Sequence, residues 1–284
     1  MTEIFSIFSS KPSVMIETYI VEQENITKTL PSVVICPGGG YVDLSSKEGK
    51  PVAVYLNTLG YNVFVLSYSV KNNTLNRDYR WPEPLLDLGT AVLYIKSHAA
   101  DWNVDKDNIY LCGFSAGGHL VAMYATCWKK KLQSYFLKNV DDLRIKAAIL
   151  VYPVLDLTIS SSENDWRILW GGENPVDDFC QFMFGNSQPS QFEMMKKSPV
   201  YLIDDNTVPC FIVHAQDDSL VNVMGSLKMV EALKQNGIPF SLHVFQTGGH
   251  GFALGEYGIT KTENLSETPN WIGLMDNWIR SQID

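Results

Sequence analysis

A serine enclosed by glycines stands where one apolar run ends and another begins. Residues 108–113 are expected to form a buried strand, and residues 120–127 continue as a helix; Gly113-Phe114-Ser115-Ala116-Gly117 lies between them. This is the G-x-S-x-G pattern in a strand-to-helix turn so tight that neighbouring positions must be glycine to clear the backbone. The pattern predicts a strained, exposed serine, and it has meaning only if the surrounding chain alternates strands with helices.

Strands and helices do alternate along the whole chain. Further apolar runs predict strands, at residues 14–21, 33–36, 63–66, 145–152, 210–213 and 240–245. Apolar residues at helical spacing predict helices at residues 47–60, 85–95 and 230–237, and at 268–279, where Thr268 and Pro269 open the helix. This order predicts an α/β fold with a mostly parallel central sheet and helices on both faces.

The length of 284 residues suits one large α/β domain, so we expect a single domain over residues 1–284. The alternation lapses at about residues 156–205, where large apolar residues gather among prolines and polar residues. These are Trp166, Trp170, Phe179, Phe182, Met183 and Phe184. Such an insertion between two strands predicts a small helical or loop cap. An ordinary pair of surface helices with a local core is an equally good interpretation.

The chain is acidic, with a formal net charge of −9. An acidic protein is repelled by nucleic acid and by anionic membrane surfaces, so we expect neither as a partner and favour a small, neutral or modestly polar ligand. Apolar runs such as residues 147–152 are only strand-sized, and the first residues lack the basic-then-apolar order of a secretory signal. We therefore expect a cytoplasmic protein.

The cysteines are odd in number and show no C-x-x-C spacing. They are Cys36, Cys112, Cys127, Cys180 and Cys210. This pattern predicts reduced thiols that fill the core, and neither a disulfide framework nor a zinc site. No metal and no organic cofactor is expected. A homo-oligomer is compatible with the sequence.

A free serine is a poor nucleophile, so Ser115 would need a base, an acid that orients the base, and donors for an oxyanion. His250 is the best candidate base, because it follows a strand in a glycine-rich loop that could reach another loop tip. His119 lies four residues after Ser115 and is expected to brace the turn. The other histidines are expected to be structural or exposed: His98, His214 and His243.

The candidate acids are Asp217 and Asp218, which follow the strand at residues 210–213. A loop at the carboxyl edge of a parallel sheet is where a carboxylate would be presented to the site. Only one of them can orient the imidazole. In isolation, two acids in a loop indicate a solvated turn. Together with His250 and the strand-to-helix turn at Ser115, they complete an ordered Ser, Asp, His set.

Oxyanion donors should come from the backbone N–H of Ala116 and from the loop after the strand at residues 33–36. That loop contains Gly38, Gly39 and Gly40. A triple glycine can also be a flexible turn or a phosphate cradle. Here it lacks both the G-x-G-x-x-G spacing and a following lysine, so nucleotide binding is poorly supported.

Four ordered motifs together resemble a known family. They are Pro-Gly-Gly-Gly-Tyr at 37–41, Gly-Phe-Ser-Ala-Gly-Gly-His-Leu at 113–120, His-Ala-Gln-Asp-Asp-Ser-Leu-Val at 214–221 and Gly-Gly-His-Gly-Phe at 248–252. The chain resembles the acetyl-xylan-esterase-like, or xylanase-associated, branch of the α/β-hydrolase serine esterases from about residue 33 onward. The resemblance implies the α/β-hydrolase fold and hydrolysis of short-chain esters, including acetyl esters of sugars or xylo-oligosaccharides, by a serine carboxylesterase.

The resemblance also assigns roles. It implies that Ser115 is the nucleophile and His250 the base, and the H-x-x-x-D pattern selects Asp218 over Asp217 as the acid. The analogous glycine loop of lipases and esterases selects Gly39 and Gly40, together with Ala116, as the oxyanion hole.

The chain departs from the family pattern at two positions, neither of which belongs to the triad. Pro37 stands where the lipase-type motif has histidine, and Asn222 stands where the family commonly has proline. The first departure weakens any transfer of substrate preference from lipase-like relatives. A serine peptidase of the same fold and a non-catalytic binding module are the two alternatives to an esterase.

Overall fold

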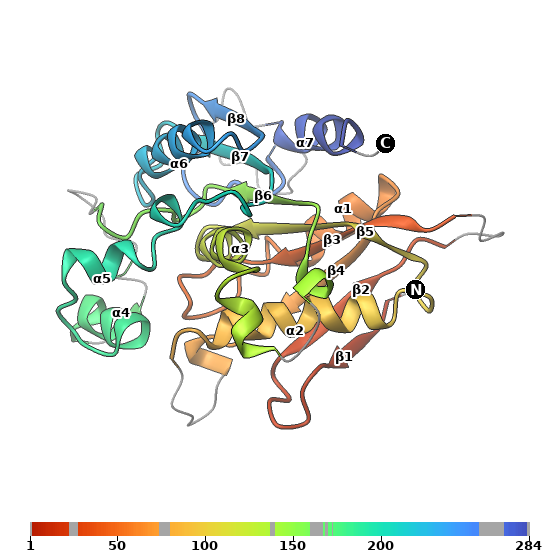
Figure 1. Cartoon of the computed structure of the whole chain (residues 1–284), viewed down its shortest axis with the longest axis horizontal. Coiled ribbons are helices and arrows are strands. Elements are labelled where there is room, and N and C mark those ends of the chain that lie inside the picture. The colour runs from red at the N-terminus through yellow and green to blue at the C-terminus, as the bar shows by residue number, and fades with distance from the viewer. Residues whose placement is uncertain are drawn as a thin grey trace.

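The computed structural model describes residues 2–22, 28–73, 80–136, 140–159, 167, 170–171, 173–255 and 270–282. Within these ranges eight strands form one sheet in the order β1-β2-β4-β3-β5-β6-β7-β8 (Figure 1). The strands are β1 (Ile4–Ser6), β2 (Met15–Tyr19), β3 (Leu30–Cys36), β4 (Asn62–Ser67), β5 (Val104–Phe114), β6 (Ala147–Val151), β7 (Cys210–Ala215) and β8 (Phe240–Phe245).

The sheet is mostly parallel, as the sequence predicts. Strand β2 pairs antiparallel with β1 and β4, and every pairing from β4 to β8 is parallel. The strands β6 and β7 are buried along their whole length, which explains their continuous apolar sequences. Strand β1 is not predicted, because a strand of three residues, two of them exposed, is too short to show a period.

Helices cover both faces of the sheet, which confirms the predicted α/β architecture. The helices are α1 (Lys50–Thr58), α2 (Glu83–Ser97), α3 (Ala116–Cys127), α4 (Pro175–Phe184), α5 (Gln191–Met195), α6 (Met224–Gln235) and α7 (Trp271–Arg280). Buried residues of α2, α3 and α6 pack in one core layer, and those of α1 and α7 pack in the other. The predicted helix opening at Thr268 and Pro269 lies outside the described residues.

The parallel strands β3, β5, β6, β7 and β8 direct their carboxyl ends to one edge, so the loops that follow them gather there.

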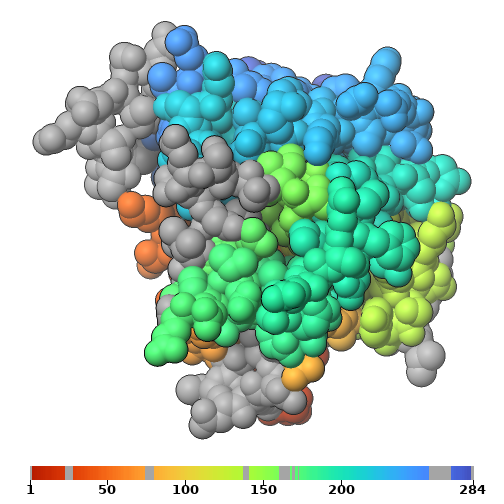
Figure 2. All heavy atoms as spheres, turned by 90° about the vertical axis from the view of Figure 1, so that its left-hand side faces the viewer, coloured from red at the N-terminus to blue at the C-terminus, as the bar shows by residue number. Residues whose placement is uncertain are grey.

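Helices α4 and α5 lie at the left of Figure 1, and Figure 2 shows residues 173–200 in the foreground of that side, in green. Trp166 lies outside the described residues. No helix in the described part of the chain is long and apolar enough to span a membrane.

Candidate active site

The turn between β5 and α3 has the strained backbone that the G-x-S-x-G pattern predicts. Ser115 adopts φ 52° and ψ −116°, a conformation that costs a non-glycine residue about 1–3 kcal/mol. Its N–H donates to the Val151 carbonyl (3.0 Å), and its carbonyl accepts from the N–H groups of His119 (3.0 Å) and Val154 (3.2 Å). The prediction of an exposed serine is wrong: Ser115 is only 7% exposed, because the loops at this edge enclose it.

Gly117 is required by the close approach of two backbones. A Cβ at this position would lie 2.1 Å from the Cys36 carbonyl oxygen and 2.5 Å from that of Pro37. The first turn of α3 therefore packs directly on the end of β3, where the glycine loop begins. The last glycine of the pattern is what allows Ser115 and that loop to share one site.

Ser115, His250 and Asp218 lie in one chain of hydrogen bonds, although they are far apart in sequence. His250 Nε2 is 2.9 Å from Ser115 Oγ, and His250 Nδ1 is 2.7 Å from Asp218 Oδ2. The backbone on either side of the histidine is left-handed, with φ 61° at Gly249 and 78° at Gly251. These glycines allow the loop after β8 to turn sharply and direct the imidazole to the serine.

The Asp218 carboxylate is buried and held by four donors. Oδ1 accepts from the N–H groups of Leu220 (2.9 Å) and Val221 (2.8 Å), while Oδ2 is shared by His250 and by His214 Nε2 (3.1 Å). Burial by itself would raise the pKa of Asp218, but the hydrogen bonds from the two imidazoles and from Val221 outweigh burial and lower it below the usual range. Asp218 is therefore ionised at neutral pH.

Asp217 lies in a different position from Asp218. Its Oδ1 accepts the Gly249 N–H at 2.8 Å, and the residue is exposed. Asp217 thus supports the loop that carries His250 and does not contact the imidazole. The structure brings Asp218, and not Asp217, to His250 Nδ1.

Two further histidines have structural contacts. His214 is buried in β7, where Nδ1 accepts from the Ser226 hydroxyl (2.8 Å) and Nε2 donates toward Asp218 and the Val221 carbonyl. It therefore fixes the loop between β7 and α6 (residues 216–223), which carries Asp218 and is called the acid loop below. His98 ends α2, with Nδ1 2.9 Å from the Tyr94 carbonyl oxygen.

The glycine loop after β3 has three consecutive left-handed residues: φ is 122° at Gly39, 63° at Gly40 and 63° at Tyr41. A Cβ at Gly39 would lie 2.2 Å from the Asp43 carbonyl oxygen. In the described ranges, no protein acceptor pairs with the backbone N–H groups of Gly39, Gly40 or Ala116. These three N–H groups are thus available to a ligand.

Sequence reasoning missed the residues that hold this loop. The Gly38 N–H donates to Glu48 Oε2 (2.6 Å), so it is not available to a ligand. The Trp170 indole N–H donates to the Gly40 carbonyl (2.8 Å), and Lys71 Nζ donates to the Trp170 carbonyl (2.7 Å). The aromatic content of residues 156–205 pointed to Trp170, but its hydrogen bond depends on long-range packing that leaves no local pattern.

The sequence predicted that His119 braces the serine turn. Its side chain contacts Tyr41 of the glycine loop. The Tyr41 hydroxyl lies 2.7 Å from His119 Nδ1, and His119 Nε2 lies 2.8 Å from the Lys197 carbonyl oxygen. Burial lowers the pKa of His119 to about 4, and the hydrogen bond to Lys197 only partly opposes that effect. The imidazole is therefore neutral, with Nε2–H donating and Nδ1 accepting.

We expect this neutral imidazole to make folding stability depend on pH. Its pKa falls from 6.5 in the unfolded chain to about 4 in the folded protein, so the unfolded chain binds more protons between these values. The contribution is complete above pH 6.5 and decreases as the pH falls toward 4, by on the order of 2 kcal/mol at pH 5. Urea unfolding at pH 7 and pH 5 should show a smaller loss for His119→Gln than for wild type. Equal losses would contradict this assignment.

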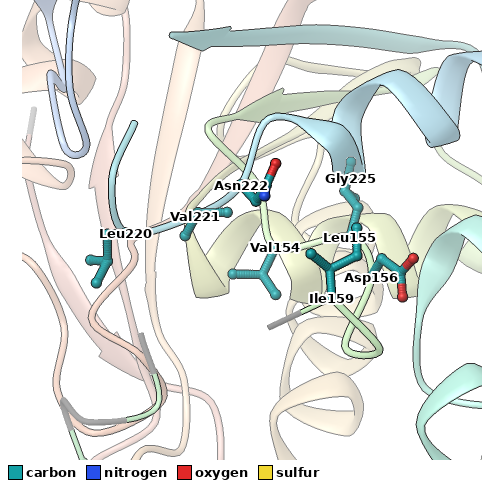
Figure 3. A pocket seen from close by; sticks show the side chains of 8 residues that line it. All are labelled: Val154, Leu155, Asp156, Ile159, Leu220, Val221, Asn222 and Gly225. Carbon is teal, nitrogen blue, oxygen red and sulfur yellow. The ribbon is translucent and has the colours of Figure 1, made fainter. Parts of the chain in front are cut away.

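A small cavity adjoins the serine turn. It has a volume of about 20 Å³ and lies between the loop after β6, including Val154 and Leu155, and the acid loop, including Val221 and Asn222 (Figure 3). Val154 connects the cavity to the turn, because its N–H binds the Ser115 carbonyl. The cavity has room for about one water molecule or one methyl group.

The family model described as BD-FAE matches residues 19–233 of this chain, a range that runs from the last residue of β2 into α6 and includes the glycine loop, the serine turn and the loop that carries Asp218. The chain belongs to the BD-FAE family. Curated relatives of this BD-FAE protein include endo-1,4-β-xylanase B of Butyrivibrio fibrisolvens, 30% identical over 81% of this chain and 35% of the relative. Acetylxylan esterase of Xylanibacter ruminicola is 26% identical over 85% of this chain and 45% of the relative.

Solved structures similar to the BD-FAE chain confirm the α/β-hydrolase fold. An acetyl ester-xyloside bifunctional hydrolase from Caldicellulosiruptor lactoaceticus superimposes with a TM-score of 0.72 at 30% identity, over 94% of this chain and 88% of that chain. A carboxylesterase from Lactobacillus plantarum gives a TM-score of 0.79 at 25% identity, over 99% and 98% of the two chains. The chain spans less than half the length of the two curated relatives above. The resemblance to acetyl-xylan-esterase-like proteins, predicted from four motifs, is confirmed.

Proposed function

We propose that this BD-FAE protein is a serine carboxylesterase that hydrolyses short-chain esters, acetyl esters of sugars or xylo-oligosaccharides among them. The observation that carries the proposal is the chain of hydrogen bonds from Ser115 through His250 to Asp218, with distances of 2.9 and 2.7 Å. The relatives and structural neighbours named as esterases support the same class of reaction.

In the proposed reaction, Ser115 Oγ attacks the ester carbonyl carbon while His250 Nε2 accepts the hydroxyl proton. Asp218 holds the imidazole with Nδ1–H toward its carboxylate and stabilises the imidazolium that forms. The negative charge moves to the former carbonyl oxygen, where the N–H groups of Gly39, Gly40 and Ala116 would donate to it. His250 then protonates the leaving alcohol, and an acyl group stays bonded to Ser115.

The second half of the reaction repeats these steps with water. His250 Nε2 accepts a proton from the attacking water, the same donors stabilise the second oxyanion, and Ser115 leaves with the proton as the carboxylic acid is released. Every proton transfer uses one imidazole, and the acid and the base each lie within hydrogen-bond distance of their partner.

We also propose that residues 156–205 form a cap on a single domain over residues 1–284. The cap is supported by Trp170, which lies between β6 and β7 in sequence and donates a hydrogen bond to Gly40 of the glycine loop.

The five cysteines are free and buried, which supports a cytoplasmic location.

The experiment compares p-nitrophenyl acetate, p-nitrophenyl octanoate and a chromogenic aminoacyl amide as substrates of the purified protein. We expect turnover of the acetate, much slower turnover of the octanoate, and none of the amide. Labelling with diethyl p-nitrophenyl phosphate, followed by peptide mass spectrometry, should place one phosphoryl group on Ser115.

Each alternative gives a different result. Turnover of the amide at a rate comparable to the acetate would indicate a peptidase, and no turnover and no label would indicate a binding module. Release of acetate from acetylated xylo-oligosaccharides, compared with acetylated glucose, would then identify the preferred sugar.

A further inference from the structure

A buried carboxylate that the proposed mechanism does not use connects the two loops that the mechanism needs. Glu48 is 5% exposed and precedes α1, on a different element from any triad residue. Its Oε2 accepts the Gly38 N–H of the glycine loop at 2.6 Å. Its Oε1 accepts the Tyr152 hydroxyl at 2.9 Å. A buried acceptor fixes both of these donors, because releasing either leaves a buried group unpaired.

Tyr152 continues this connection to the loop that carries His250. Its hydroxyl oxygen accepts the Ala253 N–H at 3.1 Å, three residues after the histidine. Its ring lies edge-on to the His250 imidazole, with centroids 5.0 Å apart. The path from glycine loop to histidine loop therefore runs through one carboxylate and one phenol, and both are buried.

Two residues of this path have a strained backbone. Tyr152 has φ 38° and Ala253 has φ 45°, values that residues with a side chain rarely adopt. Such conformations persist only where the surroundings determine them strongly. The hydrogen bonds from Tyr152 to Glu48 and from Ala253 to Tyr152 hold these two residues in place. The Trp271 indole N–H donates a further hydrogen bond to the Ala253 carbonyl (2.7 Å).

The contact at Gly38 extends the same control to the serine. A Cβ at Gly38 would lie 2.8 Å from Glu48 Oε2 and 2.9 Å from Ser115 Cβ, so no side chain fits between the carboxylate and the serine turn. Glu48 therefore holds the N–H of the residue directly before Gly39 and Gly40, the two proposed oxyanion donors of this loop.

We propose that Glu48 is a positioning residue, which sets the oxyanion loop through Gly38 and the histidine loop through Tyr152. The inference rests on the proposed ester hydrolysis at Ser115. Glu48 touches no reacting atom, so its effect is on the distance and angle between the donors, the serine and the imidazole. A displacement of about 1 Å among such groups can reduce a rate by about 100-fold.

The test measures kcat and KM on p-nitrophenyl acetate for Glu48→Gln, Tyr152→Phe and the double variant. Tyr61→Phe is the matched control, because its hydroxyl also donates from a buried ring to a carboxylate, Asp276 (2.6 Å), away from the site. We expect each single variant to lower kcat by about 10- to 100-fold with KM changed by less than about threefold. The double variant should be at most about threefold slower than the slower of the two single variants, because both residues act through one path.

Hydrogen exchange gives a readout that does not depend on turnover. Tyr152→Phe should speed exchange of the Ala253 N–H by about tenfold or more, because it removes the hydroxyl that accepts this group. Tyr61→Phe should leave this exchange and kcat unchanged while lowering the melting temperature. Unchanged kcat and exchange in Tyr152→Phe, or multiplicative losses in the double variant, would overturn the inference. Absence of ester turnover in the wild type would contradict the proposed function alone, and exchange would still test the positioning.

Discussion

Replacing Ser115 with alanine will remove ester turnover, with kcat on p-nitrophenyl acetate lowered by on the order of 10⁶-fold, the size of effect seen when a triad nucleophile is deleted in other serine hydrolases. The hydroxyl is the group that bonds to the acyl carbon, and no other side chain can replace it on the strained turn. The Ser115 hydroxyl bonds His250 in the folded protein, so its loss removes one hydrogen bond. Stability should change by only about 1 kcal/mol.

The control for this variant is Ser134→Ala, because Ser134 is an exposed serine whose hydroxyl bonds only a neighbouring carbonyl in the described structure. It should keep wild-type kcat. Circular dichroism and the melting temperature should show that Ser115→Ala is folded. Retention of more than about a hundredth of wild-type turnover would mean that the nucleophile lies elsewhere.

Replacing Asp218 with asparagine will lower kcat by about 10⁴-fold. The loss of activity follows from the four donors around the carboxylate. Oδ1 accepts two backbone N–H groups, from Leu220 and Val221, so an amide must place its oxygen there. Its NH₂ then occupies the Oδ2 position and donates to His250 Nδ1. The imidazole is forced into the tautomer with Nε2–H, which cannot accept the Ser115 proton.

The matched control is Asp217→Asn, one residue away in the same loop. Within the described part of the chain, Asp217 accepts the Gly249 N–H, and an amide oxygen can accept it equally well. We expect its kcat to stay within about fivefold of wild type. Losses of similar size for the two variants would show that the loop as a whole, and not the Asp218 carboxylate, is what the reaction needs.

Local patterns were sufficient for most of the fold. The continuous apolar runs of β6 and β7 are long enough to identify buried parallel strands, and the serine motif identifies the turn between β5 and α3. Strand β1 was not predicted, because three residues, two of them exposed, are too few to show a period. The serine was expected to be exposed because a tight turn presents its side chain outward, but loops distant in sequence cover it.

The amino-acid sequence alone predicted the class of chemistry that we propose. Ser115, an acid at 217 or 218 and His250 each follow a predicted strand, and parallel strands send their carboxyl ends to one edge, so sequence order alone gathers them. The requirement at Gly39 is also local, because a Cβ there would meet the carbonyl of Asp43 in the same loop, whereas the requirement at Gly117 comes from the approach of the distant Cys36 and Pro37 carbonyls.

Only the tertiary structure decided which groups are paired and which are free. The residues alone left Asp217 and Asp218 open, and the family resemblance favoured Asp218. The structure shows the Asp218 carboxylate at His250 Nδ1 and the Asp217 carboxylate at the Gly249 N–H. Glu48 and Tyr152 meet across 104 positions of sequence. Such a contact arises from the packing of the whole sheet edge, and a buried carboxylate without a motif has no signal until its partners are in place.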